Sequence, residues 1–163
     1  MTRGGKLLFL GILLIGMISQ TRCGGSGGGS SDPAAAPPAP AGTIVSKTAA
    51  LGAGEEVPPV ATSAGGSGHL DVDNGNGNVS GSLTIGTAPT STIIVAHVLE
   101  GGRGVNGGIV IVLENAGGGV FSVPSGKALS PAQISTFSAG GFYFNVRTAE
   151  HPNGEIRGQI DGQ

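Results

Sequence analysis

The stretch that decides the fold is residues 142–160, FYFNVRTAEHPNGEIRGQI. In residues 142–147, Phe, Phe and Val alternate with Tyr, Asn and Arg, which predicts a half-buried antiparallel strand. The turn residues Pro152-Asn153-Gly154 follow and should fold the chain back onto that strand. Residues 155–160 then provide the returning strand, with Arg147 expected to face Glu155 or the neighbours of Arg157.

Short strand-like runs separated by glycine-rich turns fill the sequence before this hairpin. Residues 78–85 alternate with period two, whereas residues 92–99 and 109–113 are apolar on both sides and are expected to form central strands. Further strands are predicted at 43–51, 68–72 and 119–123. The sequence therefore predicts one all-β domain, an antiparallel sandwich or barrel of about eight strands.

Two local signals refine this prediction. Ser130-Pro131-Ala132-Gln133 combines a capping Ser, an N1 proline and an N3 Gln, which predicts one short helix at about 131–137. The Asn-Gly pairs in residues 74–77 predict a tight hairpin turn. Residues 71–82 also begin like a twelve-residue calcium loop, but the twelfth position is Ser82 and not the bidentate Glu of that motif. The hairpin is therefore favoured.

Composition agrees with a turn-rich β domain. The 163 residues include 33 Gly and 10 Pro, together 26% of the chain, whereas only 11% are charged. The glycines have no three-residue period, which excludes collagen. Glycine at this level also disfavours a helical bundle, since each helical Gly costs about 1 kcal/mol relative to Ala.

The N-terminal residues resemble an export signal. Arg3 and Lys6 precede residues 7–18, an uncharged apolar run that is too short to span a bilayer comfortably. Cys23 follows and begins a stretch rich in Gly, Ser, Pro and Ala. We expect three parts: a signal peptide at 1–22, a disordered tether at 23–42 and a folded domain at 43–163.

Cys23 is the expected lipidation site, because a lone cysteine in this position resembles the first residue of a mature bacterial lipoprotein. Arg22 departs from the small residue usual before such a cysteine, so a free cysteine and an uncleaved anchor stay open. Removal of Arg3, Lys6 and Arg22 leaves ten acidic and five basic residues, a formal net charge of −5. No nucleic acid partner is expected. Localisation is expected at the bacterial cell envelope, as an anchored lipoprotein or a secreted protein.

Three segments resemble the CHRD domain, the repeat first named from chordin. They are LGAGEEVPPV at 51–60, Ala96-His97 followed by GGRGVNGGIV at 101–110, and NVRTAEHPNGEIRGQI at 145–160. The resemblance implies an extracytoplasmic protein-interaction or structural role with an unknown envelope or extracellular protein partner. The residues that carry the family motif are Glu56, Pro58, Pro59, His97, Asn106, Gly107, Asn145, Gly154, Glu155, Arg157 and Gly158.

The alternative function is a metal-dependent redox enzyme on a superoxide-dismutase-like sandwich, with His97 as the candidate ligand. The family pattern has further histidines where this chain has Leu99 and Arg147, and zinc or copper needs three or four convergent ligands. The other histidines are His69 and His151. His97 therefore fits a core or rim position better, and no cofactor is expected.

No catalytic constellation is visible, so the chain is predicted not to be an enzyme. G-x-G-x-x-G at 102–107 is followed by a strand-like run, which excludes a dinucleotide site. The expected domain at 43–163 contains neither a G-x-S-x-G motif nor a cysteine. Glu55 and Glu56 are expected in a solvated loop or, alternatively, an acidic binding rim. A carbohydrate-binding sandwich is a third hypothesis. Such a site usually needs exposed aromatic side chains, and Tyr143 is the only candidate.

Overall fold

The computed structural model describes residues 42–162. The predicted signal peptide, Cys23 and the predicted tether apart from Gly42 lie outside the described residues. Within them, no helix is long and apolar enough to cross a membrane.

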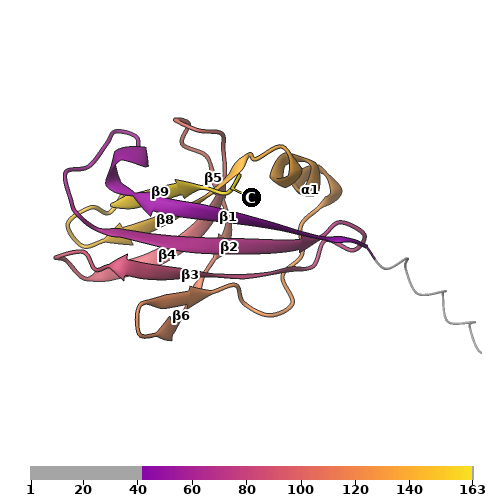
Figure 1. The fold of residues 1–163 in the computed structure, drawn as a ribbon, viewed down its shortest axis with the longest axis horizontal. Coiled ribbons are helices and arrows are strands. Elements are labelled where there is room, and N and C mark those ends of the chain that lie inside the picture. The colour runs from indigo at the N-terminus through magenta and orange to yellow at the C-terminus, as the bar shows by residue number, and fades with distance from the viewer. Residues whose placement is uncertain (1–41, 163) are drawn as a thin grey trace, which may run out of the picture. The chain divides into compact units, whose positions relative to one another are not determined.

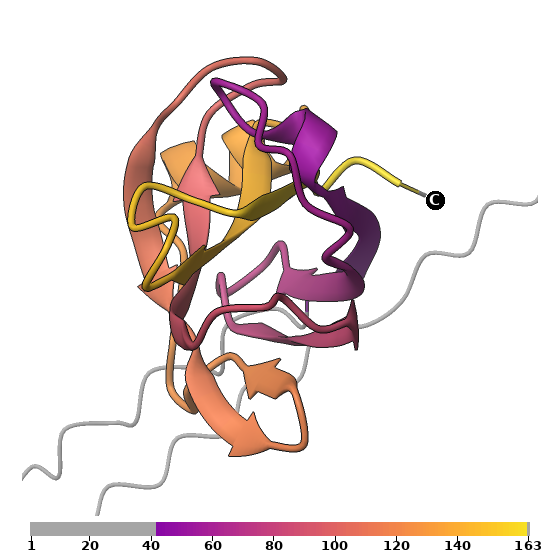
Figure 2. The ribbon, with the colours of Figure 1, turned by 90° about the vertical axis from the view of Figure 1, so that its left-hand side faces the viewer.

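In residues 42–162, nine antiparallel strands form one nearly closed sheet, in the order β5-β4-β8-β9-β1-β2-β3-β7-β6. This confirms the predicted all-β antiparallel fold. Figure 1 shows β1, β2 and β3 side by side, and Figure 2 shows the sheet curling round its core. The strands are β1 (Ile44–Gly52), β2 (Gly65–Asp73), β3 (Val79–Thr87), β4 (Ile93–Glu100), β5 (Gly108–Val112), β6 (Glu114–Gly117), β7 (Val120–Ser122), β8 (Phe142–Thr148) and β9 (Ile156–Gln159).

Both local signals in the sequence are confirmed. Helix α1 (Pro131–Ser138) begins after Ser130, whose hydroxyl accepts a hydrogen bond from the Gln133 amide while the Gln133 side chain accepts one from the Ser130 amide. β2 and β3 form a hairpin whose turn ends at Gly77, where φ is 77°. Asp73 accepts hydrogen bonds from the Gly75 amide and the Asn76 side chain, so its carboxylate closes its own turn.

Two elements, β6 and a short 3-10 helix, were not predicted from the sequence. β6 has the sequence ENAG, which carries no apolar alternation, and it is exposed along its length. It forms through backbone pairing with β7, which side-chain patterns do not report. The second element is a short 3-10 helix, η1 (Ala53–Glu55), that follows β1.

Two burial predictions were wrong. β5 was expected to be central, but it lies at an end of the sheet order, and Ile109 and Val112 are about half exposed. β8 was expected to be half-buried, but both its faces are buried. The inward side chains of β8 pack into the hydrophobic core, whereas its outward side chains lie beneath loops. Those loops create the candidate site.

Candidate functional site

A layer of polar side chains lies on the outward face of β8 and β9. Tyr143 pairs with Gln159 across the two strands, and Asn145 pairs with Arg157. All four are at least 95% buried, since none exposes more than 4% of its surface. Two loops contact this layer: residues 53–60, called the first loop below, and residues 101–107, called the second loop.

Arg157 holds the second loop in place. Its guanidinium lies 3.5 Å from the centre of the Tyr143 ring, and its Nη2 donates to the carbonyls of Gly102 at 2.8 Å and Val105 at 3.0 Å. Nη1 also donates to Asn106 Oδ1 at 3.4 Å. The side chain is 1% exposed, so this buried cation is stabilised by carbonyl dipoles and an aromatic face.

Asn106 and Gly107 tie the second loop to its surroundings. The Asn106 side-chain amide donates to the Val57 carbonyl in the first loop at 2.9 Å. The Gly107 amide donates to the Tyr143 hydroxyl at 3.0 Å. Gln159 donates to the Gly101 carbonyl at 2.9 Å and to the Gly140 carbonyl at 2.7 Å. These bonds satisfy backbone groups that loops would otherwise leave to water.

Glu56 enters the polar layer from the first loop. It is only 5% exposed, and its Oε1 accepts a hydrogen bond of 2.7 Å from the Asn145 side-chain amide. Burial raises the pKa of Glu56 from 4.5 to about 7, although Arg157, the Val57 amide and Arg147 each favour the ionised form. The expectation that Glu56 lies in a solvated loop is therefore wrong.

Two glycines of the family motif allow neighbouring segments to approach β9 and the turn before it closely. Gly154 has φ of 144°, and a Cβ there would lie 2.6 Å from Glu56 Oε2. Gly158 lies where β9 meets β1, and a Cβ there would lie 2.9 Å from Leu51 Cγ and 2.9 Å from the Ala50 carbonyl carbon. Neither position has room for a side chain.

Replacing Glu56 with glutamine should flatten the pH dependence of stability. Because folding raises the pKa of Glu56, its protonation stabilises the protein below pH 4.5, and that contribution is lost as pH rises to about 7. The free energy of unfolding of the wild type should fall relative to Glu56→Gln by about 1–3 kcal/mol over this interval. Urea unfolding at several pH values measures the difference.

Glu55→Gln is the matched control, because Glu55 is the adjacent residue and its side chain is half exposed. Its curve should run parallel to that of the wild type. Equal slopes for wild type and Glu56→Gln would contradict the assignment of a raised pKa to Glu56.

Glu155 and Arg147 do not form the expected cross-strand pair. Glu155 is buried and its Oε2 accepts a hydrogen bond of 2.6 Å from the Thr148 hydroxyl, which in turn accepts one from the His151 amide. Within residues 42–162, the ion pairs are those of Arg103, with Glu55 at 3.1 Å and Asp161 at 2.9 Å. Arg147 thus has no carboxylate partner among the described residues.

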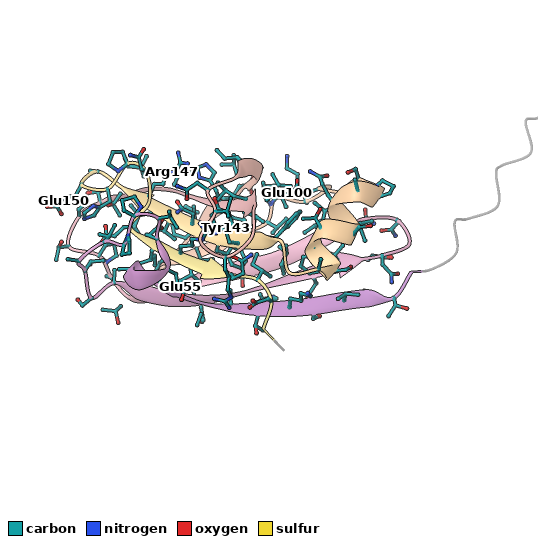
Figure 3. All side chains as sticks on the ribbon, turned by 90° about the horizontal axis from the view of Figure 1, so that it is seen from above. Glu55, Glu100, Tyr143, Arg147 and Glu150 are labelled. Carbon is teal, nitrogen blue, oxygen red and sulfur yellow. The ribbon has the colours of Figure 1, made fainter. Side chains whose placement is uncertain are left out.

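Two cavities flank the Glu56–Asn145 hydrogen bond. The first has a volume of about 240 Å³ and lies between the first loop, including the exposed Pro58, and residues 150–154. The second has a volume of about 200 Å³ and is lined by Leu99, Asn106, Gly107, Tyr143, Asn145, Arg147 and Asn153. In Figure 3, Tyr143 and Arg147 mark the course of β8, and Glu150 marks the loop after it.

The histidines do not converge. His69 lies on β2, His151 follows β8, and His97 lies on β4 opposite Asn145, where it is 5% exposed. Burial, and secondarily Arg147, lower the pKa of His97. No group of three or more His, Cys, Asp or Glu residues in the described part of the chain could hold a metal ion. The donor set around His97 therefore does not fit a zinc or copper centre.

The remaining motif residues have structural surroundings. Pro59 lies exposed in the first loop next to Pro58. The glycines of 102–107 belong to the loop between β4 and β5, and a strand, not a helix, follows them, as predicted from the sequence. Glu55 is exposed, which agrees with its predicted place in a solvated loop.

Two residues of the site were not identified from the sequence: Gln159, and Arg147 as a group that lines the second cavity. Gln159 and Arg147 each lie at alternate positions of a predicted strand, opposite apolar neighbours. Polar residues at every second position of a strand predict a face exposed to solvent. The pattern does not show that a loop covers this face and makes it part of a site.

Comparison with known protein families gives a match over most of the described chain. The family model of the CHRD domain matches residues 47–160, which is more than half of the chain. No curated protein and no solved structure gives a match. The matched range contains both loops, β8, β9 and every motif residue discussed above. The chain belongs to the CHRD domain family.

Proposed function

We propose that this protein is exported, anchored to the cell envelope through a lipid on Cys23, and acts there as a non-catalytic binding module. Export is supported by the basic and apolar residues at 1–18, and anchoring by the single cysteine at position 23. Membership of the CHRD family supports a binding or structural role.

The observation that carries the binding role is the use made of the buried polar side chains. Arg157, Asn106 and Gln159 direct their hydrogen bonds to loop backbone or to each other, and thereby fix the first and second loops over β8 and β9. Groups engaged in this way hold the two loops in place and so shape a surface. The result is a fixed face with two cavities, which suits recognition of a partner.

Expression of the full chain in a bacterium tests the export and the anchor. The mature protein should begin at Cys23, with a mass increase from the lipid, and should partition into the detergent phase. Cys23→Ser is the matched control and should remain in the aqueous phase. An unmodified Cys23 in the mature protein would contradict the anchor, and retention of residues 1–22 would contradict processing by lipoprotein export.

Elemental analysis of the purified full chain tests the non-catalytic role against a redox enzyme. We expect copper and zinc well below one equivalent per chain, because the described histidines lie apart. The same preparation dialysed against each metal and then against buffer serves as the control for loss during purification. One retained equivalent that disappears in His97→Ala would overturn the proposal.

A further inference from the structure

The cavity of about 200 Å³ beside Arg147 is lined by residues from four parts of the fold, three of which contribute polar groups. Tyr143, Asn145 and Arg147 come from β8, Leu99 from β4, Asn106 and Gly107 from the second loop, and Asn153 from the turn before β9. Only Leu99 is aliphatic. The lining is therefore suited to a small polar ligand.

Two side chains that line this cavity have buried atoms with no hydrogen-bond partner among residues 42–162. They are Arg147 Nε, which is a donor, and Asn145 Oδ1, which is an acceptor. A third such atom, His97 Nδ1, lies on the residue that faces Asn145 across β4 and β8. Unpaired buried polar atoms cost about 1–3 kcal/mol each, so a bound molecule that supplied their hydrogen-bond partners would gain affinity here.

Arg147 and Arg157 differ in burial and in hydrogen bonding, although both carry a guanidinium on the same hairpin. Arg157 is fully buried and donates hydrogen bonds to two carbonyls, so its guanidinium stabilises the fold and is not available to a ligand. Arg147 is partly exposed, forms no ion pair within the described residues and borders the cavity. Its fork of N–H groups matches a planar anion that can accept two parallel hydrogen bonds.

We propose that this cavity binds a small carboxylate that carries a hydroxyl or amide N–H next to the carboxyl group. The carboxylate pairs with Arg147, and the adjacent donor bonds to Asn145 Oδ1. A fully ionised sulfate lacks that donor, and a metal cation is repelled by Arg147. The inference rests on the proposed binding function and gives the chemical class of the ligand.

Two sources supply this chemistry, a free 2-hydroxy acid and the C-terminus of a peptide. Glycolate represents the first, and N-acetylglycine the second. NMR titration of the full chain with each probe should give saturable shifts in β8 and the second loop. Acetate, which has no donor, and N-acetylglycinamide, which has no carboxylate, should each bind at least tenfold more weakly.

Arg147→Met should weaken binding of the better probe at least tenfold, and Arg147→Lys, which keeps the charge and loses the fork, should weaken it less. Lys127→Met is the matched control, because it removes a positive charge from an exposed residue that lies outside the two loops and β8, and it should leave binding unchanged. Saturation by glycolate alone assigns a free acid, and saturation by N-acetylglycine alone assigns a peptide terminus; both support the proposal.

If neither probe saturates, the proposal is overturned. Unchanged affinity of the better probe in Arg147→Met would also overturn it. If Arg147→Met does not fold, the affinity of the folded Arg147→Lys is measured instead. Weaker binding than the wild type then supports the proposal, and unchanged affinity overturns it. Failure here is distinguishable from failure of the proposed function, because lipidation of Cys23 and the metal content do not depend on this cavity.

Discussion

Replacing Arg157 with methionine is expected to lower the free energy of unfolding by about 3–5 kcal/mol. Methionine keeps most of the apolar stem, so the change removes chiefly the guanidinium. The carbonyls of Gly102 and Val105 then lose their donors, and Tyr143 loses the cation on its ring. Carbonyls without a donor are destabilising for as long as the loop stays closed. The second loop should consequently detach from β8 and β9. Urea unfolding measures the loss of stability, and hydrogen exchange of the loop amides measures the detachment.

The control is Arg103→Met, with an expected loss of about 0–1 kcal/mol. Arg103 has two carboxylate partners within 4 Å, but its side chain is 59% exposed, and water screens both pairs. The comparison separates burial from the number of salt bridges as the source of stability. Equal losses for Arg157→Met and Arg103→Met would contradict the role given to Arg157.

Replacing Phe144 with alanine is expected to cost about 3–5 kcal/mol. Phe144 is fully buried in the core, and its ring faces Gly68 from the other side of the curled sheet: a Cβ on Gly68 would lie 2.7 Å from Phe144 Cε2. The ring thus fills the space that a glycine within β2 leaves open. Thermal and urea unfolding measure the loss.

The same contact predicts a compensating pair. Gly68→Ala alone should cost about 1–3 kcal/mol by overpacking. Combined with Phe144→Leu, it should cost less than the sum of the two single changes, because the smaller side chain admits the new methyl group. Gly54→Ala is the control, since nothing lies within 4 Å of a Cβ there. Strict additivity of the pair would show that the two positions do not share one space.

The local elements followed from the sequence because their causes are local. The capping residues around Pro131 positioned the helix, the Asn-Gly pairs positioned the β2–β3 turn, and the residues before Gly154 positioned the β8–β9 hairpin. Each signal acts within a few residues. The strand β6 was missed for the same reason, because its only cause is pairing with β7.

The candidate site was predicted only in part. The motif residues were identified from the sequence, but Glu56 was assigned to solvent and Arg147 to a pair with Glu155. Glu56 reaches Asn145 over 89 positions of chain, and Arg157 reaches the second loop over more than 50. Periodicity shows which side chains share a face of a strand, and it does not show what covers that face.

The sequence by itself determined that this chain forms an antiparallel β domain, where most strands and the helix lie, and which residues carry the family motif. Only the tertiary structure decided that Arg157 is a buried support and Arg147 a cation beside a cavity, although both lie at alternating positions of one hairpin. The physical reason is the cover: the first and second loops exclude water from one arginine and leave the other beside an open space. Closure of the sheet, and not the local pattern, places those loops.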